Sequence, residues 1–429
     1  MSPITDRQII DFIKKDVQRA LGCTEPIAVT LAVAKARETL GRKPEIIDIH
    51  VSGNILKNGM GVGIPGTDMR GLRVAAALGA LTGDSSDALE VLKNVTPEIG
   101  SQAKMMVEAG LVNIVLKNNV DKLYVEAVCR AGKDMSRVIL EKRHTNIVSV
   151  ELNDETVFKA EKETENGPGK TDSGKVKGMT TERIVEFAKT ASFDDISFIL
   201  EGVEPNWDIA MYGLEGDFGL KVGKRLTVNR PTEVIDADWM TSAMSKAAAG
   251  CDARMAGSIM PVMTNSGSGN QGITIFVPIV DVAQKVGANK DQLARALIIG
   301  NAIPIHIKTQ IGPLSALCGI VPASTGAACG IAYLMGGDFK QIERVVKYML
   351  ANTSGVFCDG AKPACALKVS TGTSAAVQAA IFGMSDDELP YSDGIISDSV
   401  EDTIDNLARI AAHGMLQTDI DILDIMTSK

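Results

Sequence analysis

Aromatic residues and histidine are scarce in this chain of 429 residues, where aromatic residues make up 4% and histidine occurs 4 times. The histidines are far apart in the sequence, so no histidine-based metal site is indicated: His50, His144, His306 and His413. Clusters of lysine and arginine are also missing, and the formal net charge is -9. These absences argue against nucleic acid or a membrane surface as the main partner.

Long apolar runs are missing as well. No stretch reaches the length of a transmembrane helix, and residues 1–16 are charged and amphipathic, without the apolar region of a signal peptide. The chain has 7 cysteines, an odd number, and lacks an export signal. We therefore expect a cytoplasmic protein whose thiols are free for metal binding or catalysis.

The composition that remains is that of a globular protein, with 45% hydrophobic and 23% charged residues. The length favours two or three domains. The 41 glycines and many alanines indicate helices that pack closely through small side chains. A mean hydropathy of +0.10 favours a homodimer.

The order of hydrophobic patterns predicts an α+β fold, with an N-terminal α+β domain followed by a mostly helical domain that carries the cysteine cluster. We place the first domain at 1–160, a polar hinge at 161–179 and the helical domain at 180–429. In the first domain we expect helices at 6–21, 24–40, 75–81 and 101–109, and strands at 45–52, 111–116, 122–130, 137–144 and 147–152, with a hairpin turn at Thr145-Asn146. In the second we expect helices at 184–190, 239–249, 291–299, 340–351, 373–382 and 400–416.

Two glycine-rich stretches do not have the features of nucleotide-binding loops. Residues 52–67 are rich in glycine and are predicted to be turn. They are not a dinucleotide-binding loop, because the order of strand, GxGxxG and helix is absent. The sequence GPGKTDSGK at 167–175 has Thr164 where a phosphate-binding loop requires its first glycine, and no apolar strand precedes it.

Four cysteines lie between Ile311 and Thr373. Cys329 has the surroundings of a core residue on an apolar helix. Cys358 and Cys365 lie in a loop that leads into an alanine-rich helix, with Cys365 near the helix start. The surroundings of Cys318 are intermediate between those of a core cysteine and those of a loop cysteine. Thiolates gathered without a histidine suit a soft metal or an iron–sulfur cluster, and the spacing is not that of a zinc finger.

Cys23 lies at the start of a helix in the motif GCTEPIA, where Thr24 is a natural N-cap and Pro26 is tolerated in the first turn. The helix N-terminus lowers the pKa of a thiol, whereas the neighbouring Glu25 raises it. The residues alone leave open whether Cys23 is a base or a capping residue without chemistry.

The motif SGSGNQGI at 266–273 follows an apolar stretch. Its glycines and hydroxyl groups leave backbone N–H groups free for an anion such as a substrate carboxylate, provided that a helix starts after it. A plain turn is the alternative.

Taken together, GCTEPIA, SGSGNQG and the cysteine segment resemble the L-cysteine desulfidase family, which is related to the iron–sulfur L-serine dehydratase alpha chain. The resemblance covers nearly the whole chain. It implies a [4Fe-4S] cluster held by Cys318, Cys358 and Cys365, with one iron open for substrate, and Cys23 as the proton acceptor. The C-x6-C spacing and the GCTEP motif favour the desulfidase branch over the dehydratase branch.

The resemblance implies a lyase that converts L-cysteine to pyruvate, ammonia and hydrogen sulfide, with L-serine deamination by the same mechanism as the alternative. The cluster would act as the Lewis acid for the leaving group, and Cys23 would take the α-proton. We expect Ser266, Ser268, Asn270 and Gln271 to orient the small amino-acid substrate.

Three alternatives remain. A pyridoxal-phosphate lyase would need a Schiff-base lysine, for which Lys246 is a candidate by position. A non-enzymatic thiol or metal sensor would use the same cysteines, although no basic DNA-binding helix accompanies them. A chain that keeps the family's fold without its cluster is the third.

Overall fold

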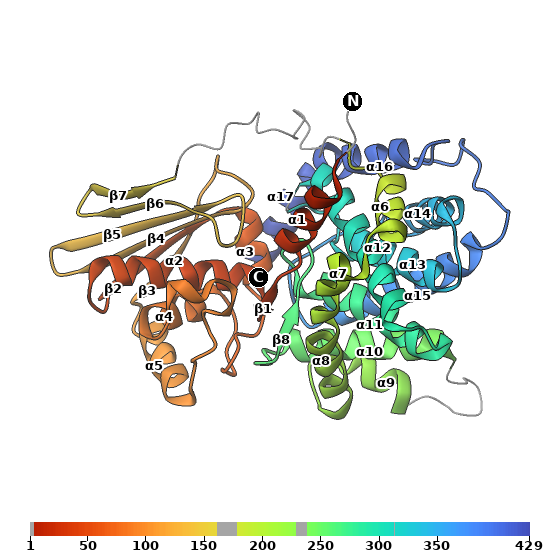
Figure 1. The fold of residues 1–429 in the computed structure, drawn as a ribbon. Helices are drawn as coiled ribbons and strands as arrows, with labels where there is room; N and C mark the ends of the chain where they lie inside the picture. The colour runs from red at the N-terminus through yellow and green to blue at the C-terminus, as the bar shows by residue number, and fades with distance from the viewer. Residues whose placement is uncertain (1–3, 161–177, 229–237, 313) are drawn as a thin grey trace.

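The computed structural model of the protein describes residues 4–160, 178–228, 238–312 and 314–429. Figure 1 shows two lobes side by side: a sheet lobe, in which helices lie against a mixed sheet, and a helical lobe formed mainly by the later part of the chain. The α+β fold class is confirmed. Within the described residues, no helix is long and apolar enough to cross a membrane.

The sheet lobe contains α2 (Thr24–Leu40), α3 (Gly53–Gly59), α4 (Leu72–Leu81), α5 (Pro97–Glu108), β2 (Ile46–Val51), β3 (Val112–Leu116), β4 (Tyr124–Ala131), β5 (Asp134–Glu141), β6 (Ile147–Leu152) and β7 (Glu155–Lys159). The strand order is β3-β2-β4-β5-β6-β7, with β2 and β3 parallel and the other pairs antiparallel.

The sheet turns one face toward α2. On β5 the buried residues alternate at Ser136, Val138 and Leu140, and the Ser136 hydroxyl donates to the Ala36 carbonyl of α2 at 2.7 Å. Helix α2 contacts the sheet and also α4. It is therefore buried around most of its circumference, which explains its nearly continuous apolar sequence.

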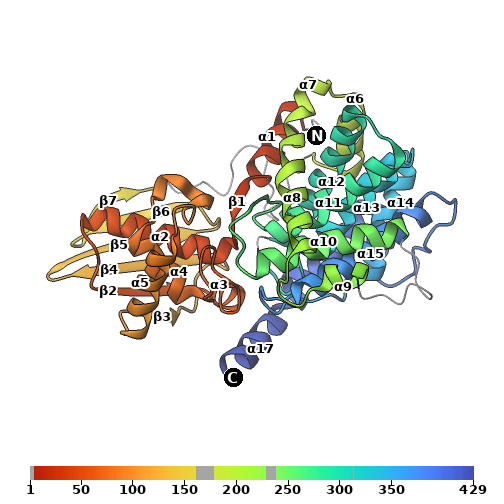
Figure 2. The same cartoon turned by 90° about the horizontal axis from the view of Figure 1, so that it is seen from below.

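The helical lobe contains α1 (Asp6–Asp16), α6 (Thr181–Thr190), α7 (Phe193–Ile196), α8 (Val203–Glu215), α9 (Val222–Val228), α10 (Trp239–Met255), α11 (Gly269–Val286), α12 (Lys290–Ile311), α13 (Ile320–Leu334), α14 (Phe339–Thr353), α15 (Cys365–Gly383) and α16 (Val400–Arg409). A last helix, α17 (Leu416–Thr427), leaves this lobe and contacts α3 of the sheet lobe, as the view in Figure 2 shows.

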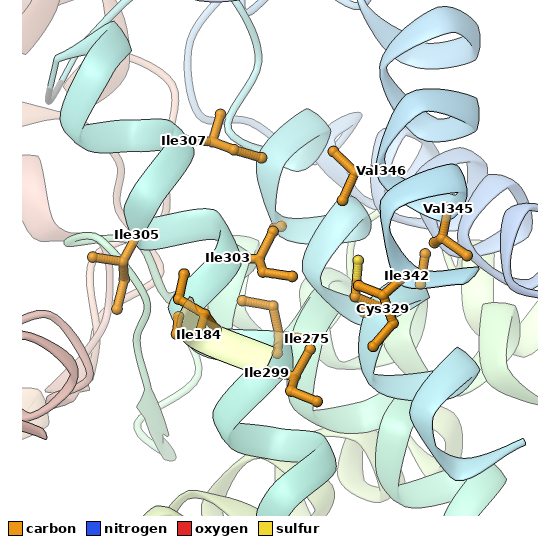
Figure 3. Packing of buried hydrophobic residues seen from close by; sticks show 14 of the residues in the cluster. Ile184, Ile275, Ile299, Ile303, Ile305, Ile307, Cys329, Ile342, Val345 and Val346 are labelled. Carbon is orange, nitrogen blue, oxygen red and sulfur yellow. The ribbon is translucent and has the colours of Figure 1, made fainter. Parts of the chain in front are cut away.

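The core of the helical lobe is aliphatic. Figure 3 shows Ile275, Ile299 and Ile303 packed together, with Cys329 beside Ile342. Cys329 is fully buried on α13, which confirms the prediction that it is a core residue. Small residues let the central helices α12 and α13 approach closely, which agrees with the glycine- and alanine-rich composition.

The N-terminal helix joins the helical lobe. The α1 residues Ile9 and Ile13 are buried in the same core as α12. The chain then reaches the sheet lobe through β1 (Arg19–Leu21), which pairs with β8 (Pro261–Met263). The domain limits near residue 160 and at residue 180 stay predictions, and residues 161–177 of the expected hinge lie outside the described residues.

Four sequence predictions about local structure were wrong. Residues 17–21 do not continue the first helix, because Arg19–Leu21 pairs with β8. Residues 53–59, predicted as turn, form α3, whose start is capped when the Ser52 hydroxyl accepts from the Ile55 N–H at 3.4 Å. The N-cap of α2 is Cys23 rather than Thr24, whose hydroxyl bonds elsewhere. The helix predicted at 400–416 breaks at a π-helical turn over Ile410–Gly414.

Candidate active site at the junction of the two lobes

A cavity of about 110 Å³ lies where the two lobes meet. It is large enough for several water-sized groups. Its wall contains all eight residues that the sequence predicted for the site: Cys23, Ser266, Ser268, Asn270, Gln271, Cys318, Cys358 and Cys365.

Cys318 and Cys358 are held opposite each other by a short antiparallel contact between two loops. Leu317 and Phe357 form an isolated β-bridge. On either side of it, the Cys318 N–H donates to the Val356 carbonyl at 2.9 Å and the Cys358 N–H donates to the Ala316 carbonyl at 2.6 Å. The two thiols hydrogen-bond each other, which lowers the pKa of Cys358 and raises that of Cys318.

Cys365 is the first residue of α15, and its Sγ lies 3.7 Å from the Gly360 carbonyl oxygen. The loop before it depends on Gly360, which has a φ of +89°. A side chain there would place Cβ 2.4 Å from the Lys57 carbonyl oxygen. Glycine therefore lets the cysteine loop pass directly over α3 of the other lobe.

Cys23 is buried at the start of α2. Burial raises the pKa of its thiol to about 12, while the charge of Arg254 lowers it and that of Glu25 raises it. Burial thus outweighs the charge of Arg254 and favours the protonated thiol. The sequence left open whether the pKa of Cys23 is raised or lowered, and burial of the thiol raises it.

The SGSGNQGI motif is a tight turn that leads directly into α11. The N–H groups of Asn265 and Ser268 each donate to the other residue's carbonyl, at 3.1 and 2.9 Å. Helix α11 begins at Gly269, with Ser268 as its N-cap, so the helix start that the anion-binding hypothesis required is present. The Thr24 hydroxyl donates to the Gly267 carbonyl at 2.6 Å and joins this turn to the start of α2.

Lysine side chains surround the cysteine loops. Lys57, which is 1% exposed, donates to the Cys358 carbonyl at 3.2 Å, and Lys368 donates to the Phe357 carbonyl at 2.8 Å. Lys308 lines the cavity, and burial lowers its pKa to about 8. These cations favour negative charge at the cysteines.

Sequence reasoning missed several residues of the cavity wall. Glu25 and Asn58 come from the sheet lobe, as does His144, which follows β5; Arg254 comes from α10. The nearby Cys251 is fully buried, and its pKa is raised by burial and by the charge of Cys365. Only Glu25 had a local signal, its place beside Cys23; the others converge through the fold.

Comparison with known proteins places the chain in a family. A model of the serine dehydratase alpha chain matches residues 86–424. The chain belongs to the serine dehydratase alpha-chain family. Similar proteins include a UPF0597 protein of Bacteroides fragilis, 45% identical over 99% of this chain and 98% of the relative. A UPF0597 protein of Parabacteroides distasonis is 46% identical over the full length of both chains.

Membership of the serine dehydratase alpha-chain family implies a lyase-type enzyme that acts on a small amino acid. Members of this family are typically iron–sulfur dependent. The expected relation to the iron–sulfur serine dehydratases is thereby confirmed.

The cysteines of the cavity are ligands of the chemical type that holds an iron–sulfur cluster. Three cysteines line one cavity next to buried lysines, and the charge of Cys365 raises the pKa of Cys318. Among the described residues, no three Cys, His, Asp or Glu side chains are arranged to hold a single metal ion. The thiolates of a cubane cluster each bind a different iron, so they stand farther apart than the ligands of one ion.

The lysine suggested for a pyridoxal-phosphate site does not line the cavity of this family member. Lys246 pairs with the buried Asp281 and lies 5.1 Å from the centre of the Trp207 ring. Lys246 is therefore not positioned to form a Schiff base in this cavity.

Proposed function

We propose that the protein is a [4Fe-4S]-dependent lyase that converts L-cysteine to pyruvate, ammonia and hydrogen sulfide, with L-serine as the alternative substrate. The observation that carries this proposal is the meeting of Cys318, Cys358 and Cys365 with Cys23 in one cavity. A bound cluster with one iron free would supply a Lewis acid for the β-leaving group, and Cys318, Cys358 and Cys365 would hold it.

The chain's own residues supply the proton chemistry and the orientation. Cys23 takes the α-proton as general base once its thiol has ionised. The nearby Arg254 assists that ionisation, because its charge lowers the pKa of the thiol. Elimination gives aminoacrylate, which tautomerises and hydrolyses to pyruvate and ammonia in water.

The SGSGNQG turn orients the substrate in this proposal. Ser266, Ser268, Asn270 and Gln271 line the cavity beside Cys23, at the N-terminus of α11. A carboxylate there would meet free backbone N–H groups and the positive end of the helix dipole. A protein with Ser268→Ala and Asn270→Ala together should show a raised KM, and an unchanged KM would remove this role.

The test is anaerobic purification followed by iron and sulfide analysis and a pyruvate assay with L-cysteine and L-serine side by side. Cys318→Ser should lose iron and activity together. Cys23→Ser should keep the iron content but lower kcat by about 10²-fold or more, the usual contribution of a general base. Cys129→Ser, a buried cysteine of β4, is the matched control and should keep both iron and activity.

Two results would contradict the proposal. Iron-free protein that still releases pyruvate, with a yellow band bleached by borohydride, would identify a pyridoxal-phosphate enzyme. Iron-loaded protein that releases no pyruvate from either amino acid would leave a metal-binding protein without this activity.

A further inference from the structure

Two side chains of opposite charge flank Cys23 on the cavity wall. Glu25 comes from the first turn of α2, and its side chain is 12% exposed. Arg254 comes from the last turn of α10 and is 3% exposed. Both line the cavity, so an acidic and a basic group face a small, enclosed space around one thiol.

Arg254 is bound by neutral acceptors, and it also hydrogen-bonds the side chain of Cys23. Its Nη2 donates to the Gly22 carbonyl at 2.7 Å and its Nη1 donates to Asn270 Oδ1 at 2.9 Å. The Nε atom is buried and has no hydrogen-bond partner among the described residues. A buried guanidinium with a donor to spare is suited to an incoming carboxylate.

Glu25 is correspondingly held by a neutral donor. Its carboxylate accepts from Asn58 Nδ2 at 3.1 Å, and its other oxygen lies 3.3 Å from Thr24 Oγ1, whose proton goes to the Gly267 carbonyl. His144 Nε2 lies 4.0 Å away, and burial lowers the pKa of this imidazole, which keeps it neutral. The Glu25 carboxylate therefore lies among neutral groups on the cavity wall.

Besides Arg254 Nε, two polar atoms of the same wall are buried without a partner among the described residues, His144 Nε2 and Gln271 Oε1. Gln271 is 5% exposed, and its Oε1 is buried without a hydrogen-bond donor among the residues that the structure describes. Burying charged and polar groups without partners is costly, unless a ligand supplies the missing partners. The wall thus offers a ligand an unpartnered cationic donor and an unpartnered amide oxygen, together with the Glu25 carboxylate.

We propose that Arg254 receives the α-carboxylate and Glu25, with Gln271, the α-ammonium group of a small amino acid, so that its Cα–H is held against Cys23. The assignment rests on the proposed function for the part that Cys23 plays. Arg254 also donates to Asn270, so the guanidinium and the part of the turn from Ser266 to Asn270 form one carboxylate-binding surface, while Gln271 faces the ammonium group. Ligands that lack either charge should bind poorly.

The arrangement also links binding to the chemistry. The negative charge of Glu25 raises the pKa of Cys23. An ammonium group placed on Glu25 neutralises that charge and so favours the thiolate when substrate is present.

The experiment is calorimetric titration of the anaerobic, iron-loaded full chain in a Cys23→Ser background, in which bound amino acid is consumed at least about 10²-fold more slowly. The probes are L-serine, 3-hydroxypropanoate, which lacks the ammonium group, and ethanolamine, which lacks the carboxylate. Each truncated probe should bind about tenfold more weakly than L-serine, or worse, which corresponds to about 1.4 kcal/mol.

Two variants then separate the two charges. Glu25→Gln should weaken L-serine and ethanolamine about tenfold and leave 3-hydroxypropanoate unchanged. Arg254→Gln should weaken L-serine and 3-hydroxypropanoate and leave ethanolamine unchanged. Glu108→Gln and Arg7→Gln, on exposed parts of α5 and α1, are the matched controls and should change none of the three affinities.

The assignment would be overturned if Glu25→Gln weakened the binding of all three ligands equally, or if its affinity for L-serine were unchanged. If Arg254→Gln fails to fold, Glu25→Gln alone decides the assignment. Protein that shows the expected selectivity, while iron-loaded protein with Cys23 intact releases no pyruvate, would refute the proposed reaction and leave the binding assignment standing. Pyruvate release without that selectivity would refute the assignment alone.

Discussion

At the scale of single residues, the least expected side chain is Lys57. It lies in a stretch that was predicted to be a glycine-rich turn, yet it is 1% exposed on α3 and pairs with Asp419 of α17 at 2.6 Å. It also donates to the carbonyl of Cys358. One cation therefore joins α3, the C-terminal helix and a cysteine loop.

Replacing this lysine should cost stability. Lys57→Met removes a buried ion pair and leaves the Asp419 carboxylate without its cation, which should lower the free energy of unfolding by about 3 kcal/mol. Lys104→Met on α5 is the control, since its exposed pair with Glu108 should contribute less than about 1 kcal/mol. Urea denaturation of both variants measures the difference, and equal effects would contradict the special role of Lys57.

Glu126 of β4 should make stability depend on acid pH. Burial raises the pKa of this carboxyl, but hydrogen bonds from Lys117, Tyr124 and Arg137 outweigh it and lower the pKa to about 2. A lowered folded-state pKa means that the contribution is fully present above the ordinary value near 4.5 and is lost as the pH falls toward 2.

The comparison of wild type with Glu126→Gln tests this dependence. The stability difference between them should be largest at about pH 6 and shrink as the pH falls through about 4, because the carboxylate of the unfolded chain then begins to bind protons while that of the folded protein stays ionised. Denaturant titrations across this range measure it. A difference that is constant with pH would show that Glu126 acts only through its shape.

At the scale of helices and strands, close crossings in the helical lobe depend on glycines, which have no side chain to keep the helices apart. A Cβ atom at Gly326 of α13 would lie 2.1 Å from the Gly300 carbonyl oxygen of α12. The two helices therefore meet backbone to backbone, as the composition suggested in general terms.

Gly326→Ala should force α12 and α13 apart. We expect the free energy of unfolding to fall by about 1–3 kcal/mol, the usual cost of overpacking a core. Gly355→Ala is the control, because a Cβ there meets no atom within 4 Å. Thermal and urea unfolding compare the two, and similar midpoints for both variants would contradict the close crossing.

The same scale explains where sequence reasoning about local structure failed. Residues 17–21 have helical spacing, but Arg19–Leu21 pairs with β8, more than 200 residues away in the chain. The β7 strand, which the sequence did not predict, is exposed along its whole length and exists through pairing with β6. Both outcomes depend on a distant partner that local periodicity does not contain.

At the scale of the whole molecule, the candidate site needs both lobes. Cys23 and Asn58 come from helices of the sheet lobe, whereas Cys318 and Cys365 belong to the helical lobe. The cavity is closed by contacts between them, including the Thr24 hydroxyl on Gly267 and Lys57 on Cys358.

Removing the proposed cluster should therefore weaken the junction. Iron-loaded protein should have a higher Tm than protein treated anaerobically with a chelator, because a ligand that binds only the folded state stabilises it. Cys318→Ser should show no difference between the two treatments, while the Cys129→Ser control should behave as wild type. Equal Tm values for loaded and stripped wild-type protein would contradict a cluster at this position.

What the sequence determined by itself is the fold class, part of the helices and strands, and the chemical type of the site. The fold class, the core position of Cys329, the helix start at Cys365 and the eight cavity residues all follow from local patterns or from motifs that resemble a known family. The homodimer and the domain limits stay predictions.

What only the tertiary structure decided is how distant segments meet. Glu25, Asn58, His144 and Arg254 come from four different elements, and no spacing in the sequence relates them. The same holds for the pKa of Cys23, which burial raises and the charge of the distant residue Arg254 lowers. Burial and charge pairing are sums over neighbours in space, and the chain defines those neighbours only once it has folded.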